Sequence, residues 1–373
     1  MGKPEIRFKG YTDEWEQRKL GDVAQEFKSG NSLKADEIDI TGDYPVYGGN
    51  GLRGYTSTYN HDGEYALIGR QGALCGNMNY SAGKAYFTEH AVVVKADENN
   101  VTRFLYYMLD TMNLGQYSDQ SAQPGLAVNK LVKLENSFPK KEEQQQIGAY
   151  FRSLDHLITL HQRKCDEVKS LKKYMLQKMF PQNEQKVPEI RFEGFTEAWE
   201  QRKLGEVTQC LDSERVPINS EEREKIPGEI PYYGAGNIQG YINKFLFDEE
   251  LVLLLEDGDA FDDFRTKEIA QYICGKTWVN NHAHVLRPLG DAYFLYVTLS
   301  HKDIRNWVQL AGASRKKLVQ KSMLNIELFM PHIIEQKKIG QYFSNLDHLI
   351  TLHQQKCEEL KKIKKFMLQK MFV

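Results

Sequence analysis

The stretch EQQQIGAYFRSLDHLITLHQRKCDEVKSLKKYMLQKMF, residues 143–180, returns as EQKKIGQYFSNLDHLITLHQQKCEELKKIKKFMLQKMF, residues 335–372. In each copy apolar or half-apolar side chains recur at steps of three and four, which predicts a helix with one apolar stripe. The first stripe is Phe151, Leu154, Ile158, His161, Cys165, Val168, Leu171, Met175 and Met179. The second stripe is Phe343, Leu346, Ile350, His353, Cys357, Leu360, Ile363, Met367 and Met371.

A helix of this length, about 57 Å, cannot bury its stripe against itself. Two near-identical stripes in one chain predict that the helices pair as an antiparallel coiled coil. The alternative is that each helix docks separately on its own domain. Lysines crowd the last turns, which suits the helix dipole, and Pro181 is expected to end the first helix.

A second repeat precedes each helix. PEIRFKGYTDEWEQRKLGDV, residues 4–23, returns as PEIRFEGFTEAWEQRKLGEV, residues 188–207, with 15 of 20 positions identical. Between the repeated blocks lie residues 24–142 and 208–334, which share little sequence. Drift after duplication would not spare only the connecting parts, so the pattern indicates a symmetric scaffold that carries two different domains.

The chain is therefore divided into five parts. They are an opening segment with the first variable domain (1–142), a central helix (143–180), a linker (181–187), a second opening segment with the second variable domain (188–334) and a C-terminal helix (335–373). Short β-rich runs such as Leu251–Leu255 predict more strand than helix in the variable domains. We predict an α+β fold with two mixed α/β domains, separated by the paired helices in a pseudo-twofold, pseudo-circular arrangement. The C-terminus is then expected near Pro4.

The first variable domain contains YGGNGLRGY, residues 47–55, which fits the G-x-G-x-x-G dinucleotide fingerprint. The second variable domain has YYGAGNIQGY, residues 232–241, which keeps Y-G-x-x-x-x-x-G-Y and loses the fingerprint spacing. No helix start follows the first copy, although a nucleotide site requires one. The glycines more plausibly allow the backbone to approach a surface closely, and the neighbouring polar side chains are candidates for phosphate or base contacts.

These arguments give a set of candidate DNA contacts in glycine-rich or small-residue loops. In the first variable domain they are Tyr47, Gly49, Asn50, Arg53, Arg70, Gln71, Asn77 and Lys130. In the second they are Tyr233, Asn237, Gln239, Arg265, Asn281, Arg315, Lys316 and Lys317. The alternative for these loops is an ordinary solvated surface.

Other chemistry finds little support in the sequence. There is no G-x-x-x-x-G-K-[ST] phosphate loop, no [ND]-P-P-[YF] segment for amino-methyl transfer and no arrangement typical of nucleophilic catalysis. His282 and His284 are predicted to be packed or hydrogen-bonded rather than metal ligands. The acids from Glu256 to Asp263 are predicted to be solvated loop charge, with a divalent ion or a cytosine amino group as alternatives. No catalytic residue and no metal site are therefore expected in this chain.

Composition sets broader limits. The net charge of −2 does not favour DNA binding by the whole surface, but it leaves room for a local basic groove or a basic partner. Five cysteines without a C-x-x-C pair favour reduced thiols. No apolar run approaches a membrane span, and no apolar leader opens the chain, so a cytoplasmic protein without membrane contact is expected.

Three features together resemble the specificity subunit of type I restriction–modification systems. They are E-Q-x-x-I-G-x-[YF]-F-x-x-L-D-x-L-I in each helix, P-x-[IV]-R-F-x-[GD]-[FY]-x-x-x-W-E-x-[RK]-x-L-G-[DE] opening each half, and W-V-N-N-H-A-H-V-L at 278–286. The resemblance covers essentially the whole chain. The first domain departs from the last motif at Glu89-His90-Ala91, so its reading surface is expected to differ.

The resemblance implies a non-catalytic subunit that binds double-stranded DNA. Each variable domain would be a target recognition domain for one half of a bipartite, asymmetric site. The helices would set the spacer and dock two methyltransferase subunits, and two motor–nuclease subunits would complete the complex. The residues expected to pair the helices and bind the methyltransferase are Phe151, Leu154, Ile158, Phe343, Leu346 and Ile350. S-adenosylmethionine, ATP and Mg²⁺ would belong to the partner subunits, and none to this chain.

Two further hypotheses remain at this stage. The first is a coiled-coil scaffold that presents two protein-binding domains without reading DNA. The second is a stand-alone enzyme that uses the acidic loop and the histidines.

Overall fold

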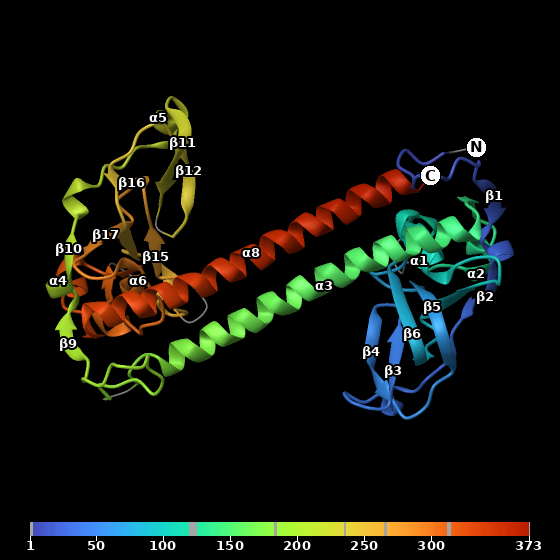
Figure 1. The fold of residues 1–373 in the computed structure, drawn as a ribbon, viewed down its shortest axis with the longest axis horizontal. Coiled ribbons are helices and arrows are strands. Elements are labelled where there is room, and N and C mark those ends of the chain that lie inside the picture. The colour runs from blue at the N-terminus through green and yellow to red at the C-terminus, as the bar shows by residue number, and fades with distance from the viewer. Residues whose placement is uncertain are drawn as a thin grey trace. The chain divides into compact units, whose positions relative to one another are not determined.

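The computed structural model describes residues 3–118, 125–182, 185–234, 236–264, 267–311 and 315–372. The chain forms two compact units, one of Met1–Gln162 with Gln354–Val373 and one of Arg163–His353. Each unit includes part of both long helices, α3 (Lys141–Lys178) and α8 (Ile333–Met371) (Figure 1). The boundaries predicted from sequence instead set the helices apart as segments of their own.

The first unit is built on a six-stranded sheet in the order β2-β7-β5-β6-β3-β4. Its strands are β2 (Ala24–Ser29), β3 (Tyr44–Gly48), β4 (Gly51–Thr56), β5 (His61–Gly69), β6 (Met78–Phe87) and β7 (Ala91–Ala96). Strand β7 and the second half of β5, from Tyr65 to Gly69, are almost continuously apolar and buried, and α1 (Thr102–Thr111) and α3 pack on one face of the sheet. The smaller elements are β1 (Glu16–Lys19), which pairs with β8 (Glu135–Phe138), and α2 (Val128–Leu131).

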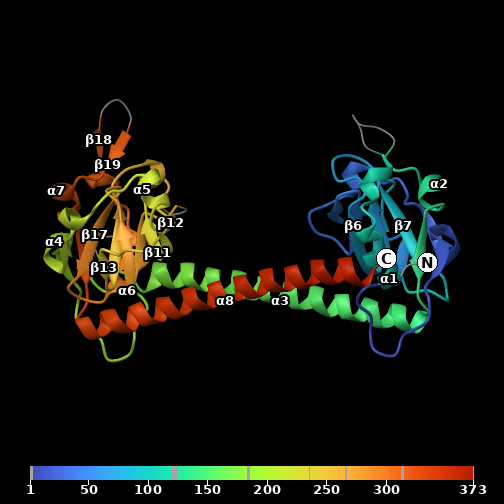
Figure 2. The ribbon, with the colours of Figure 1, turned by 90° about the horizontal axis from the view of Figure 1, so that it is seen from above.

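The second unit holds the equivalent strands in two four-stranded sheets, β10-β17-β14-β15 and β12-β11-β16-β13. They are β10 (Thr208–Cys210), β11 (Pro227–Tyr233), β12 (Ile238–Ile242), β13 (Phe247–Asp248), β14 (Leu251–Leu255), β15 (Ala270–Ile273), β16 (Lys276–Val279) and β17 (Ala283–Pro288). The other elements are β9 (Glu200–Lys203), which pairs with β20 (Glu327–Met330), α4 (Leu204–Val207), α5 (Ser220–Glu224), α6 (Ala292–Ser300) and α7 (Gln320–Met323). The hairpin of β18 (Gln309–Ala311) and β19 (Arg315–Lys317) extends from this unit beyond α7 (Figure 2).

Both units pair α3 with α8 in opposite directions through the same contacts. In the first unit Lys364 Nζ lies 2.6 Å from Asp155 Oδ1, and in the second Lys172 Nζ lies 2.5 Å from Asp347 Oδ1. The residues of one pair are the repeat equivalents of those in the other, since both offsets are 192. The pairing as an antiparallel coiled coil is confirmed in each unit, and so are the mixed domains, in which strands outnumber helices.

The repeated opening segments sit on the ends of the long helices. Ile190 N–H donates to Lys178 O at the end of α3 (2.8 Å), where the two segments are joined by the linker. Ile6 N–H donates to Lys370 O at the end of α8 (2.9 Å), where no covalent link exists. This contact lies within the first unit, so the prediction that the chain's end approaches Pro4 is confirmed.

Candidate nucleic-acid interface

The sequence YGGNGLRGY forms the hairpin β3–β4, and its register is interrupted. Val46 faces Gly54, but the next residue, Tyr47, faces Leu52. Arg53 is therefore an extra residue in β4, a β-bulge, which is a feature that re-aims a side chain. Arg53 is exposed, while Tyr47 is half-buried with its ring 6.1 Å from that of Phe87.

The second unit repeats this hairpin as β11–β12 with the same interruption. Tyr232 faces Gly240 and Tyr233 faces Ile238, which leaves Gln239 as the extra residue. Both hairpins also pair in parallel with the next sheet strand at the equivalent step, Tyr47 with Phe87 and Tyr233 with Val279. Arg53 and Gln239 therefore occupy the same structural position, although the sequences of the two hairpins differ at most positions.

The glycine after each tyrosine lies under this position. A Cβ built on Gly48 would fall closer than 3.0 Å to Arg53, and one on Gly234 closer than 3.0 Å to Gln239. A side chain at either glycine would displace the bulged side chain from its present position. The glycine of each Y-G pair therefore lies beneath the bulged residue in both units.

Gln239 borders a polar pocket of about 440 Å³ in the second unit. Asn280 is buried, and its side chain accepts a hydrogen bond from His282 N–H (2.9 Å) and donates to Gln239 Oε1 (3.4 Å). The exposed Asn281 lies at the rim, and Tyr232 lines the wall. Asn237 is exposed at the tip of the hairpin, where its carbonyl accepts from Gly234 N–H (2.9 Å).

In the first unit three candidate segments converge beside the hairpin. Gly49 is buried against the backbone of His90, and Gln71 Oε1 lies 3.1 Å from His90 Nδ1. Arg70 donates through Nη1 to Glu89 O (3.4 Å). The exposed residues Asn50, Gln71 and Asn77 are candidates on the surface of this part of the unit.

The basic candidates of the second unit are largely ion-paired. Lys316 pairs with Asp262, and Lys317 Nζ lies 3.1 Å from Glu256 Oε1. Arg315 lies in β19, but its side chain and the whole of Arg265 are outside the described residues. In the first unit Lys130 is exposed in α2. The acidic loop predicted to be solvated charge thus holds the lysines next to it.

A buried hydrogen-bond network around His284, which the sequence did not reveal, holds the end of the β18–β19 hairpin. His284 is 2% exposed, with Nδ1 2.5 Å from Asp212 Oδ2 and Nε2 2.7 Å from Leu318 O. Burial opposes ionisation of Asp212, but His284, the N–H of Val285 and the nearby Arg215 together outweigh burial and hold the pKa of Asp212 below its usual value. His284 is a hydrogen-bonded core residue, as predicted, and it fixes the chain just after β19. In the first unit the equivalent residue is the buried Val92.

Most stripe residues are covered by their own units. Phe151 and Phe343 are fully buried, Leu154 and Leu346 nearly so, and Ile158 and Ile350 are half-buried. Their role in partner binding stays a prediction. The periodicity missed a second set of apolar residues on the long helices, each at least 38% exposed. These are Leu157, Leu160 and Tyr174 on α3 and their repeat equivalents Leu349, Leu352 and Phe366 on α8.

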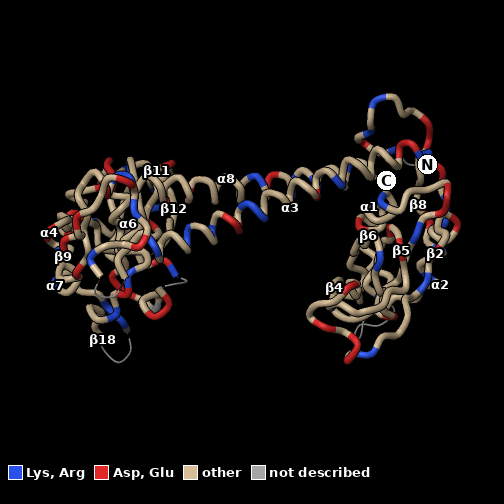
Figure 3. The backbone as a smooth tube through the Cα atoms, turned by 60° about the horizontal axis from the view of Figure 1, so that its bottom comes forward, with Lys and Arg blue, Asp and Glu red and all other residues tan. Residues whose placement is uncertain are grey.

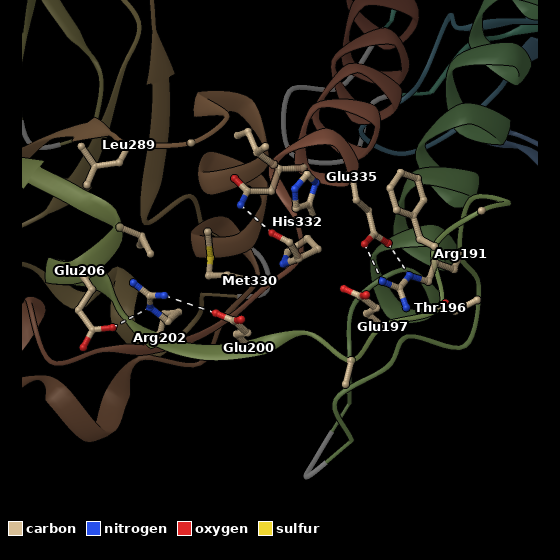
Figure 4. Close-up of a pocket in the computed structure, with 18 residues that line it drawn as sticks. Arg191, Thr196, Glu197, Glu200, Arg202, Glu206, Leu289, Met330, His332 and Glu335 are labelled. Carbon is tan, nitrogen blue, oxygen red and sulfur yellow. Dashed lines mark hydrogen bonds and ion pairs between the residues drawn. The ribbon is translucent and has the colours of Figure 1, made fainter.

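The second opening segment and α8 border an open pocket of about 690 Å³ (Figure 4). Arg191 and Glu335 close one side through two hydrogen bonds, Nε to Oε1 at 2.6 Å and Nη2 to Oε2 at 2.8 Å. The same fork joins Arg7 to Glu143 in the first unit, also at 2.6 and 2.8 Å. The exposed pair Arg202–Glu206 lines another side of this pocket.

Lysines and arginines are interspersed with acidic residues along the backbone of both units (Figure 3). Within the described residues no group of three or more His, Cys, Asp or Glu side chains is arranged to hold a metal ion. No helix in the described parts of the chain is both long and apolar enough to cross a membrane.

Comparison with known proteins adds a family. A family model described as type I restriction modification DNA specificity domain matches residues 12–170 and 196–362. The chain is 42% identical over 156 residues to the type I restriction enzyme EcoprrI specificity subunit of Escherichia coli, covering 41% of this chain and 39% of that protein. A putative specificity subunit of Haemophilus influenzae is 34% identical over 161 residues, covering 43% and 40%. These matches thus span about two fifths of the relatives' length.

The fold has a solved counterpart. The crystal structure of the type I restriction–modification S subunit from M. genitalium superposes with a TM-score of 0.78 at 18% identity, covering 100% of this chain and 99% of that one. At this identity the likeness concerns the fold alone.

Proposed function

The chain belongs to the family of type I restriction modification DNA specificity domains, and we propose that it is the DNA specificity subunit of a type I restriction–modification complex. Each unit would read one half of a bipartite, asymmetric site in double-stranded DNA. The observation that carries this is the pair of bulged hairpins, because the same backbone register presents different side chains at the same position. Two dissimilar reading surfaces on a repeated frame require two dissimilar half-sites.

We propose that this chain binds the DNA and positions it for the partner subunits. The side chains of the two hairpins and the polar pocket are suited to hydrogen bonds with base edges, while lysines and arginines suit phosphates. We assign methyl transfer, with S-adenosylmethionine, and ATP-driven cleavage, with Mg²⁺, to partner subunits. The interspersed acidic and basic residues and the net charge of −2 fit a subunit that binds DNA together with a basic partner.

The partner surface is proposed from the repeat. Leu157 and Leu160 are exposed on α3, and Leu349 and Leu352 are exposed at the equivalent positions of α8. Apolar residues exposed twice in the same pattern indicate two copies of one partner. We therefore infer that two methyltransferase subunits dock, one on each unit, and that two motor–nuclease subunits complete the assembly.

A domain exchange tests the proposed function. The chain is produced with its methyltransferase partner in a host whose genome is then sequenced for methylated adenine. Replacing residues 24–142 by the matching segment of a relative should change one half of the methylated site and leave the other half intact. If wild type gives no sequence-specific methylation but still assembles with protein partners, the chain is a scaffold. Methylation by the purified chain alone would make it an enzyme.

A further inference from the structure

The two bulged residues stand apart from the other candidate contacts. Arg53 and Gln239 are the only residues of the two described hairpins left without a cross-strand partner by the matched register shifts. Bulges concentrate where a side chain must be aimed at a function. Gly48 and Gly234, which the two copies share, lie beneath them, and a side chain there would displace the bulged residue from its present position.

Each bulged residue also has a buried polar neighbour at one equivalent position. In the second unit this is Asn280, 4% exposed, whose carboxamide is fixed by His282 N–H and holds Gln239 Oε1. Gln239 lines the pocket, and its Nε2 lies over Gly234. In the first unit the neighbour is Thr88, fully buried, whose hydroxyl finds no hydrogen-bond partner in the described chain. A Cβ on Gly48 would lie 3.4 Å from that hydroxyl, so it faces the space that Arg53 crosses.

The chemistry of the two residues differs in a way that matters for DNA. The guanidinium of an arginine matches O6 and N7 of guanine, and the carboxamide of a glutamine matches N6 and N7 of adenine. Arg53 is not tied to a carboxylate among the described residues, unlike Lys316 and Lys317. A free fork and an oriented carboxamide are both ready to bind a base edge.

Resting on the proposed function, we propose that this bulge position determines one base of each half-site. Arg53 reads a guanine in the half-site of the first domain, and Gln239 reads an adenine in that of the second. The remaining hairpin residues hold the position in place.

The test measures methylation by the complex of this chain with its methyltransferase partner on a plasmid library in which the site is randomised. Arg53→Gln should shift one guanine of one half-site towards adenine by roughly 5- to 150-fold and leave the other half-site unchanged. Gln239→Arg should make the reverse change in the other half-site. Lys19→Gln, which removes a charge from an exposed strand residue of the first unit, should change neither.

The possible outcomes separate the two proposals. A wild-type complex that methylates without sequence preference overturns the proposed function itself. Sequence-specific methylation whose site is identical in all variants overturns the bulge assignment alone. Arg53→Lys keeps the charge but not the bidentate fork, so it should weaken the guanine preference. Full retention of that preference would mean a phosphate contact. Complete loss of methylation in both Arg53 variants, with unchanged melting temperature, would also count against base reading.

Discussion

The buried ion pair of Arg191 and Glu335 joins the second opening segment to α8, and we predict that it contributes strongly to the stability of this unit. Glu335 is fully buried and Arg191 is 11% exposed, and two hydrogen bonds join them. Glu335→Gln keeps the shape and one acceptor oxygen but removes the charge. The guanidinium then stays buried without a counter-ion, and its Nη1 already has no partner among the described residues.

The burial of the pair sets the expected loss of stability. Removing one partner of a buried ion pair lowers the free energy of unfolding by about 3–5 kcal/mol. Glutamine retains one acceptor oxygen, so we expect the lower end of this range, about 3 kcal/mol. Glu335 also lies in the first turn of α8, where its charge offsets the helix dipole. For a unit of this size each kcal/mol lowers the melting temperature by roughly 2–4 °C, so Glu335→Gln should lower it by about 6–12 °C.

Differential scanning calorimetry of the full chain measures this, with a matched control in the same segment. Glu206→Gln breaks the exposed pair with Arg202, which is 45% exposed and screened by solvent, so it should leave the melting temperature nearly unchanged. Glu143→Gln should reproduce the large effect through the equivalent fork to Arg7. The double variant Arg191→Met with Glu335→Leu should regain most of the loss, since it leaves no buried charge. A shift of Glu335→Gln no larger than that of Glu206→Gln would refute the reasoning.

Three further predictions concern pH, assembly and spacing. Burial lowers the pKa of His301 to about 4, so at pH values between about 4 and 6.5 the unfolded chain binds a proton that the folded chain does not. The free energy of unfolding should therefore fall by about 1 kcal/mol per pH unit as the pH drops from 6.5 towards 4. Calorimetry of His301→Gln should find a flatter dependence of stability on pH. Leu349→Asp should remove one methyltransferase subunit from the complex by native mass spectrometry, and adding Leu157→Asp should remove both; retention of both in the double variant would contradict the docking surface. Deleting seven residues from each long helix shortens it by about 10 Å, so the unread spacer should lose about 3 base pairs in the methylated site or recognition should fail, and an unaltered site would exclude the helices as its determinant.

The sequence predicts those features whose cause is local or repeated. The long helices follow from spacing along one stripe, and their pairing follows from the presence of two stripes. The linker joins the end of the first long helix to the second opening segment. Because the repeat places the other helix and the first opening segment in the same relation, the C-terminus is expected near Pro4. The periodicity could not separate the buried Phe151 from Leu171, which lies on the same stripe and is 44% exposed, because which part of the stripe the domain covers depends on the domain itself.

The sequence could not predict features that depend on distant pairing. The bulge at Arg53 exists only once Val46 has been paired with Gly54, and nothing in the local letters sets that register. The network of His284 joins Asp212 and Leu318, which lie 72 and 34 residues away. A comparison of the two copies gave the one available indication, since the opening Y-G and the closing G-Y were kept where the glycines at 49 and 51 were replaced.

The anchors between the variable domains and the helices explain how the domains can diverge without loss of the frame. Asp155 of α3 accepts a hydrogen bond from Tyr107 (2.7 Å), and the equivalent Asp347 of α8 accepts one from Tyr293 (2.8 Å). These tyrosines are not sequence equivalents. Tyr107 follows the core residue Phe104 by three positions, whereas Tyr293 precedes the corresponding Phe294 by one, which places them one helical turn apart on the same face.

Each domain therefore brings its own hydroxyl to a carboxylate that the repeat supplies. That carboxylate is at the same time held by a lysine of the opposite helix, Lys364 in one unit and Lys172 in the other. A variable domain therefore needs only a hydrogen-bond donor that reaches this aspartate, and its sequence can otherwise differ. A domain exchanged between two members of the family should dock on the foreign helices as long as such a donor lies on that face of its helix.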